Sequence, residues 1–300
     1  MATIIDTIKY RYKTGSILTK IIFINIGVFL VLRIGAIVCT FGGWDVDGNM
    51  LHWIELPSSP VILLSRPWTI ITYMFSQFDI LHILFNMLWL YWFGTVFLFT
   101  GNTRQMFALY LYGGIFGALA FMCAYNLFPY FEGTNGWLIG SSASVIAIVA
   151  ATAMLHPDYK MSLLFIGEIS LKWIAVATIA IDFLSITDSN AGGHIAHIGG
   201  AVIGVIYGTM LNRGTDITRP FNMMLDKAVN TWNTIMYKIK QTQSNKAKPK
   251  TGTRYNSKQS TTDNDRVVLD SILDKIKKSG YASLSAEEKK TLFDVSRRVK

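Results

Sequence analysis

A serine stands at the point where a long apolar segment begins. Ser142 follows a glycine-containing approach at residues 136–141, and no charged residue occurs between Glu132 and Asp158. A serine at a helix start is ordinarily a cap. It becomes a nucleophile when a base removes its proton, and the candidate base is His197, in the segment Gly-Gly-His-Ile-Ala-His-Ile-Gly-Gly. The pair predicts hydrolysis, provided that water reaches it.

Hydrolysis also needs donors that stabilise the negative charge of a tetrahedral intermediate. The first-turn N–H groups of a helix that begins near Ser142 have no partner within the helix, so they are available. His82 and Asn86 are four residues apart and therefore lie on one helix face, where they would add two neutral donors. No acidic residue is obviously placed as a third member, so the expected machinery is a Ser142–His197 dyad without a metal or a cofactor.

Two glycines follow the candidate base. Gly200 and Gly204 have the four-residue spacing that lets helices approach closely in a membrane. The expected partner is the helix that begins at Ser142, because close approach would bring His197 within reach. Each feature alone is a weak signal, since buried serines and histidines are commonly structural and such glycine pairs usually only pack helices. Their combination is what favours an enzyme.

The composition indicates that these groups lie in a membrane protein. Of the 300 residues, 51% are hydrophobic and 16% are charged, and the mean hydropathy is +0.35. Residues 1–212 contain 9 Lys/Arg and 10 Asp/Glu, whereas residues 213–300 contain 19 Lys/Arg and 9 Asp/Glu. A basic tail directly after the last apolar segment favours contact with anionic lipid over nucleic acid. The lipid bilayer is therefore an expected partner and nucleic acid is not.

Six apolar segments are predicted to span the membrane, so the expected fold class is an all-α polytopic membrane protein, a six-helix bundle with a C-terminal helical tail. These segments are residues 17–41, 80–100, 106–128, 142–155, 171–186 and 194–211. The fourth is shorter than the roughly 20 residues that a bilayer requires, so it should begin or end inside the bundle. The flanking Lys/Arg residues predict that both termini are cytoplasmic. Ser142 and His197 then lie near the outer face.

The sequence divides into four predicted parts: a cytoplasmic N-terminus at 1–16, a six-helix domain at 17–212, a basic amphipathic helix and linker at 213–263, and a small helical hairpin at 264–300. Residues 218–241 have apolar side chains near helical spacing. Residues 242–263 are rich in Lys, Ser, Thr and Gln, which is typical of a flexible linker. In the hairpin, Ser285 and Glu288 have the spacing of a capping box.

Three motifs resemble those of a known family. They are His82-Ile-Leu-Phe-Asn86, Gly140-Ser-Ser142-Ala143, and Ala196-His197-Ile-Gly-Gly200 with Gly204. Together with their order and the span topology over residues 17–212, they closely resemble the rhomboid family of intramembrane serine proteases, of the bacterial type. The resemblance implies a serine endopeptidase that cleaves transmembrane segments of single-span membrane proteins. It also implies a multi-pass protein in the inner (plasma) membrane of a bacterium.

The resemblance implies a role for each motif residue. Ser142 is the expected nucleophile and His197 the expected base. The expected oxyanion site is lined by His82, Asn86 and the N–H groups of Ser141 and Ser142.

The sequence departs from the family pattern at several positions. Gln77 stands where many members have another histidine, Ala143 where a glycine is usual, and Ile146 where many members place an aromatic residue against the base. Because Ser141 and Ser144 flank the expected nucleophile, the assignment to Ser142 depends on the register of the motif. His194, one turn before the expected base, is expected to be a loop or rim residue.

Two other function classes compete with the protease. One is a catalytically inactive rhomboid-like protein that binds membrane clients; such relatives lack the serine or the histidine, and both are present here. The other is a transporter or channel, which predicts inverted repeats, and the two halves of the sequence show none. The sequence does not specify the substrate, the cleavage sequence, the oligomeric state, the role of the basic tail, or a function for Arg33 and Asp182.

Overall fold

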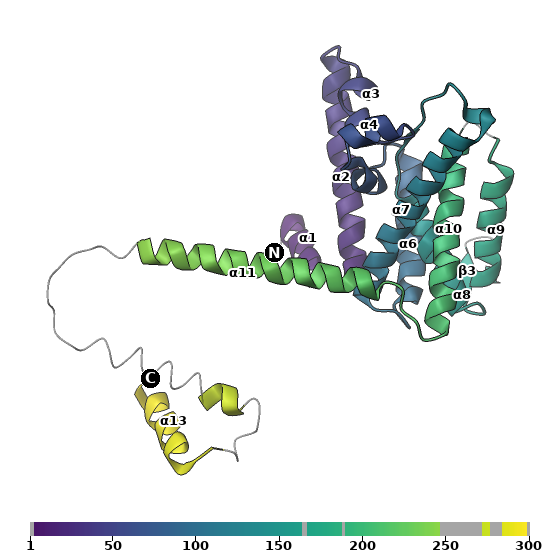
Figure 1. Cartoon of the computed structure of the whole chain (residues 1–300). Helices are drawn as coiled ribbons and strands as arrows, with labels where there is room; N and C mark the ends of the chain where they lie inside the picture. Colours follow the sequence, from purple (N-terminus) through teal and green to yellow (C-terminus); the bar gives the residue numbers. More distant parts are fainter. Residues whose placement is uncertain (1–2, 164–166, 188–189, 247–271, 277–283, 299–300) are drawn as a thin grey trace. The chain divides into compact units, whose positions relative to one another are not determined.

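The structure is a computed structural model of a mostly helical chain. It describes residues 3–163, 167–187, 190–246, 272–276 and 284–298. The chain separates into two compact units, Met1–Asn233 and Thr234–Lys300. The first unit is a bundle of helices (Figure 1), and helix α11 (Arg219–Lys246) begins in this unit and ends in the second.

Four of the described helices are long and apolar enough to cross a membrane: α2 (Ile17–Phe41), α6 (Ile80–Phe97), α7 (Thr103–Leu127) and α10 (Ala191–Asn212). Helices α8 (Ser142–Leu155) and α9 (Leu171–Leu184) have 14 residues each, and α8 is apolar. The predicted helical class is confirmed, whereas the count of six spans stays a prediction. In Figure 1, α2 and α9 stand at opposite edges of the bundle.

Polar caps determine where the membrane helices begin. Ser16 caps α2, and Asn102 forms a capping box with Gln105 at the start of α7. Asp79 caps α6, because its carboxylate accepts a hydrogen bond of 2.7 Å from the His82 N–H. Each cap satisfies first-turn N–H groups that have no partner within the helix. The Asp79 cap fixes the turn that holds His82.

Helix α8 lies at the centre of the bundle, and its residues from Ala143 to Ala153 are buried. The neighbouring helices α7 and α10 have glycines where they contact α8. A Cβ atom on Gly113 of α7 would lie 2.6 Å from the Ala147 Cβ atom, and one on Gly204 of α10 would lie 2.3 Å from the Ala147 carbonyl oxygen. Both neighbours therefore pack against α8 at backbone contact distance, which small residues permit.

The connection between α2 and α6 folds into short elements. They are α3 (Val46–Asn49), η1 (Leu51–Trp53), β1 (Leu56–Pro57), α4 (Pro60–Ser65), α5 (Thr69–Thr72) and η2 (Tyr73–Phe75). Strand β1 pairs antiparallel with β2 (Trp137–Leu138), with Leu56 opposite Leu138. This pairing connects the α2–α6 connection to the residues just before Ser142. The position of these residues is therefore fixed by the connection as well as by the bundle helices.

Two further regions have regular structure where none was predicted. Residues 156–170, expected as a plain connection, contain an antiparallel hairpin of β3 (Lys160–Leu163) and β4 (Gly167–Ser170). The N-terminal residues, expected to be only polar and basic, contain helix α1 (Ile4–Thr14). The strands have four residues each and α1 has 11, which are the lower limits of the lengths at which hydrophobic periodicity identifies a strand or a helix.

The second unit contains helix α13 (Ala286–Arg298), which begins with the predicted capping box. The Glu288 N–H donates to Ser285 Oγ at 3.2 Å, and the Ser285 N–H donates to Glu288 Oε2 at 2.7 Å. Lys275 Nζ donates to the same glutamate at 2.7 Å. Helix α11 continues to Lys246, so residues 242–246 of the predicted linker are helical and that part of the prediction is wrong. The rest of the predicted linker lies outside the described residues.

Candidate active site

The structure brings the Ser142 hydroxyl oxygen within 2.6 Å of the His197 Nε2 atom. Ser142 is the first residue of α8, and His197 lies in the second turn of α10. Helix packing explains the approach. A Cβ atom on Gly200, one turn after His197, would lie 2.2 Å from the Ala143 carbonyl oxygen. Only a glycine at this position lets α10 come so close to the first turn of α8.

The neighbouring serines point elsewhere. Ser141 is fully buried, and its Oγ accepts a hydrogen bond of 3.0 Å from Gln77 Nε2. Ser144 is also fully buried, and its Oγ has no hydrogen-bond partner among the described residues. Ser142 alone of the three is partly exposed and lies against a histidine. The geometry therefore distinguishes three serines that the sequence distinguishes only by motif register.

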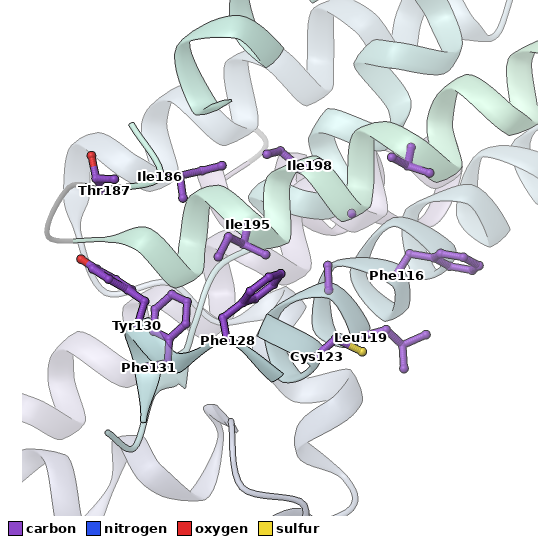
Figure 2. Close-up of a pocket in the computed structure, with 13 residues that line it drawn as sticks. Phe116, Leu119, Cys123, Phe128, Tyr130, Phe131, Ile186, Thr187, Ile195 and Ile198 are labelled. Carbon is purple, nitrogen blue, oxygen red and sulfur yellow. The ribbon is translucent and has the colours of Figure 1, made fainter. Parts of the chain in front are cut away.

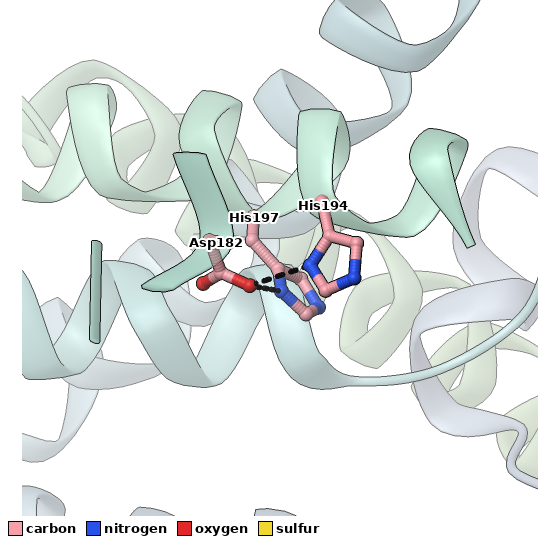
Figure 3. Close-up of side chains that lie close together, drawn as sticks. All are labelled: Asp182, His194 and His197. Carbon is pink, nitrogen blue, oxygen red and sulfur yellow. Dashed lines mark hydrogen bonds and ion pairs between the residues drawn. The ribbon is translucent and has the colours of Figure 1, made fainter. Parts of the chain in front are cut away.

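A carboxylate lies behind the histidine, where none was expected. Asp182, near the end of α9, has its Oδ1 atom 2.8 Å from His197 Nδ1 (Figure 3). Its side chain is 10% exposed, so little water competes for this hydrogen bond. The expectation that no acid completes the pair is wrong in the structure, because α9 places its last turn beside the second turn of α10. Ser142, His197 and Asp182 form a continuous chain of hydrogen bonds.

His194 is also part of this cluster rather than a loop or rim residue. Its Nδ1 atom lies 2.9 Å from the same Asp182 Oδ1 atom, and its side chain is 20% exposed. His194 and His197 are one turn apart on α10, and their rings are nearly perpendicular, at 85° (Figure 3). Two imidazoles thus converge on one carboxylate oxygen from different directions.

The hydrogen bonds determine which nitrogen of His197 has the proton. The Asp182 carboxylate only accepts hydrogen bonds, so His197 Nδ1 must donate to it. In the neutral ring the Nε2 atom then has a lone pair, which points at the Ser142 hydroxyl. This tautomer can take the serine proton.

A cavity of about 200 Å³ opens beside the Ser142 hydroxyl. It is lined by His82, Phe85, Asn86, Trp89, Ser142, Val145, Ile146, Thr178, Asp182 and His197. The expected oxyanion donors His82 and Asn86 are therefore in one cavity with the expected nucleophile and base. A cavity of this size with polar groups on its wall has room for water and for part of a substrate.

Gly140 keeps space open between two of these groups. Its φ angle is +135°, in a region that residues with a side chain rarely adopt. A Cβ atom there would lie 3.3 Å from His82 Cε1 and 3.6 Å from Ser142 Oγ. The Gly140 N–H donates to the Tyr73 carbonyl at 3.1 Å. A glycine at this position therefore leaves room where an oxyanion would form.

Gln77 organises the buried side of the site, and the sequence indicated only that it departs from the family pattern. Its Oε1 atom accepts a hydrogen bond of 2.8 Å from Asn86 Nδ2. Its Nε2 atom donates to Ser141 Oγ at 3.0 Å and to Asn25 Oδ1 at 3.2 Å. Gln77 and Asn86 are both buried. One side chain thus orients the Asn86 amide and links it to α2 and to the start of α8.

A larger cavity, of about 680 Å³, lies beside α10 (Figure 2) and shares no lining residue with the cavity at Ser142. Its lining comes from α7, from η3 (Pro129–Phe131), from the residues after α9 and from α10. Phe116, Leu119, Phe128, Ile195 and Ile198 are among the side chains that surround it. Its described lining is largely apolar and includes Cys123 and Tyr130 but no histidine or carboxylate.

The smaller cavity has the groups that acyl transfer to water requires. They are a hydroxyl against an imidazole, a carboxylate behind that imidazole, and neutral donors on the facing wall. The same cluster offers metal ligands. One oxygen or nitrogen atom from each of Asp182, His194 and His197 lies within 4.8 Å of the others.

Comparison with protein families gives two matches. Residues 64–214 match the Rhomboid domain model, which is half of the chain and includes every predicted site residue. Residues 252–298 match DUF6576, a family of unknown function.

Curated relatives extend the same match. RHOMBOID-like protein 12, mitochondrial, of Arabidopsis thaliana is 27% identical over 65% of this chain and 58% of its own length. Presenilin-associated rhomboid-like protein A, mitochondrial, of Danio rerio is 29% identical over 55% of this chain and 43% of its own length. Presenilin-associated rhomboid-like protein, mitochondrial, of Bos taurus is 26% identical over 63% of this chain and 47% of its own length. The chain spans about half the length of these relatives.

These relatives correct two expectations. All three are named as mitochondrial proteins, which contradicts the predicted location in the inner membrane of a bacterium. They also give no support to the bacterial type of the family. The Rhomboid domain match covers residues 64–214 and so includes the positions of His82, Ser142 and His197. The chain therefore belongs to the rhomboid family.

Proposed function

We propose that this protein is an intramembrane serine endopeptidase that cleaves transmembrane segments of single-span membrane proteins. The observation that supports this most is the 2.6 Å contact between Ser142 Oγ and His197 Nε2 at the wall of a cavity. Membership of the rhomboid family supports the same activity. The names of the relatives favour a mitochondrial membrane as the place where the protein acts.

The first step forms an acyl-enzyme. Ser142 Oγ attacks the carbonyl carbon of the scissile peptide bond, and His197 Nε2 takes the serine proton. The resulting imidazolium donates its Nε2 proton to the leaving amine when the C–N bond breaks. Asp182 accepts the Nδ1–H hydrogen bond throughout, so it keeps the ring oriented and stabilises its positive charge.

The second step releases the acyl group. A water molecule in the cavity loses a proton to His197 Nε2 and attacks the ester carbonyl, and the proton then returns to Ser142 Oγ as the ester bond breaks. In both steps the oxyanion is stabilised by His82, by Asn86 and by the N–H groups of Ser141 and Ser142. Gln77 holds the Asn86 amide in place for this task.

The position of the site favours substrates that lie in the membrane. Helix α8 has 14 residues and packs against the longer helices α6, α7 and α10, so Ser142 at its start lies inside the bundle. The carbonyl groups of a membrane-spanning helix are paired within that helix. A substrate must therefore unwind locally before a carbonyl reaches Ser142, and the polar groups of the cavity would satisfy the backbone groups that unwinding releases.

The test is cleavage of a single-span substrate by the purified full-length protein in liposomes. The wild type should cleave it, and Ser142→Ala and His197→Ala should each retain less than about 1% of the rate, since removal of a catalytic group costs several orders of magnitude. Ser144→Ala is the matched control, because it removes a buried serine hydroxyl two residues away and should retain cleavage.

The competing function is binding of membrane clients without cleavage. That function would give co-purification of the single-span protein with the wild type, no product, and no difference between wild type and Ser142→Ala. This result would refute the proposed protease.

A further inference from the structure

The cluster of Asp182, His194 and His197 has more ligand atoms than the proposed hydrolysis uses. Hydrolysis requires one carboxylate hydrogen bond to His197, but a second imidazole approaches the same oxygen at 2.9 Å. His194 does not line the Ser142 cavity and does not contact Ser142 in the structure described. The proposed chemistry therefore leaves His194 unexplained.

We propose that Asp182, His194 and His197 form an inhibitory site for a divalent transition-metal ion such as Zn²⁺. The ligands would be one carboxylate oxygen and one nitrogen from each imidazole, and water in the adjoining cavity would supply the fourth. Imidazole and carboxylate are ligand types that Zn²⁺ accepts, and three protein ligands with an open position is a common arrangement for it.

The distances in the cluster suit a metal ion. Zn–N and Zn–O distances near 2.0–2.1 Å place neighbouring ligand atoms of a tetrahedral site roughly 3.3 Å apart. The Asp182 oxygen lies 2.8 Å from His197 Nδ1 and 2.9 Å from His194 Nδ1, so each pair would open by about half an ångström. The rings are at 85° to one another, and both Nδ1 atoms lie within 3 Å of the same carboxylate oxygen; each Nδ1 atom becomes a metal ligand once its ring proton moves to Nε2. The three side chains are 10–20% exposed, and an ion can reach them through the Ser142 cavity, which Asp182 and His197 line.

Metal binding and catalysis need different tautomers of His197. For hydrolysis, Nδ1 has the proton and Nε2 has the lone pair that faces Ser142 Oγ. A metal on Nδ1 takes the lone pair of that nitrogen, so the single ring proton moves to Nε2. The ring then donates to the serine oxygen and cannot remove the serine proton. The bound metal therefore switches the base off without covering the nucleophile. This inhibition rests on the proposed protease function, whereas the metal site itself does not.

The experiment uses full-length protein and has one readout that is independent of activity. Co²⁺ is titrated into the detergent-solubilised protein and followed by its visible absorption, and Zn²⁺ is then added to displace it. His194→Gln removes one ligand and retains a side chain able to donate to Asp182. His156→Gln is the matched control, because His156 lies at the other end of α8 and contacts Thr100. The second readout is the Zn²⁺ concentration that halves substrate cleavage, with each variant compared with its own metal-free rate.

We expect the wild type and His156→Gln to bind one Co²⁺ that Zn²⁺ displaces, and to be inhibited by Zn²⁺. In His194→Gln the affinity for Co²⁺ should fall by about 10–100-fold or more, the scale associated with a lost supporting interaction at a metal site. The Zn²⁺ concentration that halves cleavage should rise by the same factor. Wild-type affinity in His194→Gln, or no metal binding by the wild type, would overturn the proposal. A protein that cleaves but binds no metal refutes the metal site alone. One that binds metal through His194 but never cleaves refutes the protease alone.

Discussion

Replacement of Gly200 by alanine should separate the proposed base from the nucleophile. A Cβ atom at this position would lie 2.2 Å from the Ala143 carbonyl oxygen, whereas ordinary contacts begin near 3.4 Å. The obstacle is backbone, so it cannot rotate away. Helix α10 must therefore shift from α8 by about 1 Å, the difference between these two distances.

The size of that shift sets the expected loss of activity. His197 is three residues from Gly200, or about 4.5 Å along the helix axis, so it moves with the same turn. The contact between His197 Nε2 and Ser142 Oγ would lengthen from 2.6 Å to beyond the normal hydrogen-bond range. A displacement of 1 Å at a reacting group costs about 100-fold in rate, so Gly200→Ala should lose about two orders of magnitude in kcat.

The assay is cleavage of one single-span substrate together with thermal unfolding in the same detergent. Gly27→Ala on α2 is the neutral control, because a Cβ atom there meets nothing within 4 Å. Gly208→Ala controls for stability, since its Cβ would lie 2.6 Å from the Met154 Cβ atom but about 12 Å further along α10 from Gly200. It should lower the unfolding temperature with a much smaller loss of kcat. Activity of Gly200→Ala within threefold of the wild type would refute this reasoning.

Three further predictions concern single side chains. Asp182→Asn should lower kcat by roughly 10²–10⁴-fold with little change in KM, because the negative charge that stabilises the His197 imidazolium is lost and the asparagine amide can donate to Nδ1, which favours the tautomer with the proton on Nε2; an unchanged kcat would exclude Asp182 from the site. Asn86→Ala should cost about 10²–10³ in kcat through the loss of one oxyanion donor, and wild-type kinetics would contradict that role. Burial and the nearby charge of Asp47 raise the pKa of Glu55 from 4.5 to about 7. The folded state therefore binds more protons than the unfolded state between these values, and unfolding free energy falls by about 3 kcal/mol as pH rises through them. Glu55→Gln should raise the unfolding temperature at pH 8 and leave it unchanged at pH 4; equal effects at both pH values would contradict this.

The sequence predicted the helices whose ends are set by local chemistry. The span predicted at residues 17–41 is α2, because Ser16 caps its first turn and the segment is strongly apolar despite Lys20 and Arg33. The segment predicted at residues 142–155 is α8, because Gly140 and two serines interrupt the apolar pattern before it. The motifs identify Ser142 and His197 as candidate residues. The predicted topology places both near the same end of the bundle, so the sequence also predicts that they lie close together.

The remainder of the site depends on tertiary geometry that periodicity does not encode. The sequence identifies Asp182 only as an acidic residue within an apolar segment. Its contact with His197 depends on the angle at which α9 and α10 pack, and hydrophobic periodicity does not give that angle. His194 was assigned to the rim for the same reason. Gln77 lies in a connection between α2 and α6 without periodic structure, so nothing in its surroundings indicated hydrogen bonds to Ser141 and Asn86.

The most direct measurement identifies which serine is nucleophilic. The protein is treated with a fluorophosphonate, which modifies activated serine hydroxyls, and the modified residue is located by mass spectrometry in the wild type and in single alanine variants. The predicted result is modification of Ser142 in the wild type and in Ser141→Ala and Ser144→Ala, with loss of modification in Ser142→Ala and His197→Ala. Modification that persists in Ser142→Ala, or that maps to Ser141 or Ser144 in the wild type, would contradict the proposed mechanism.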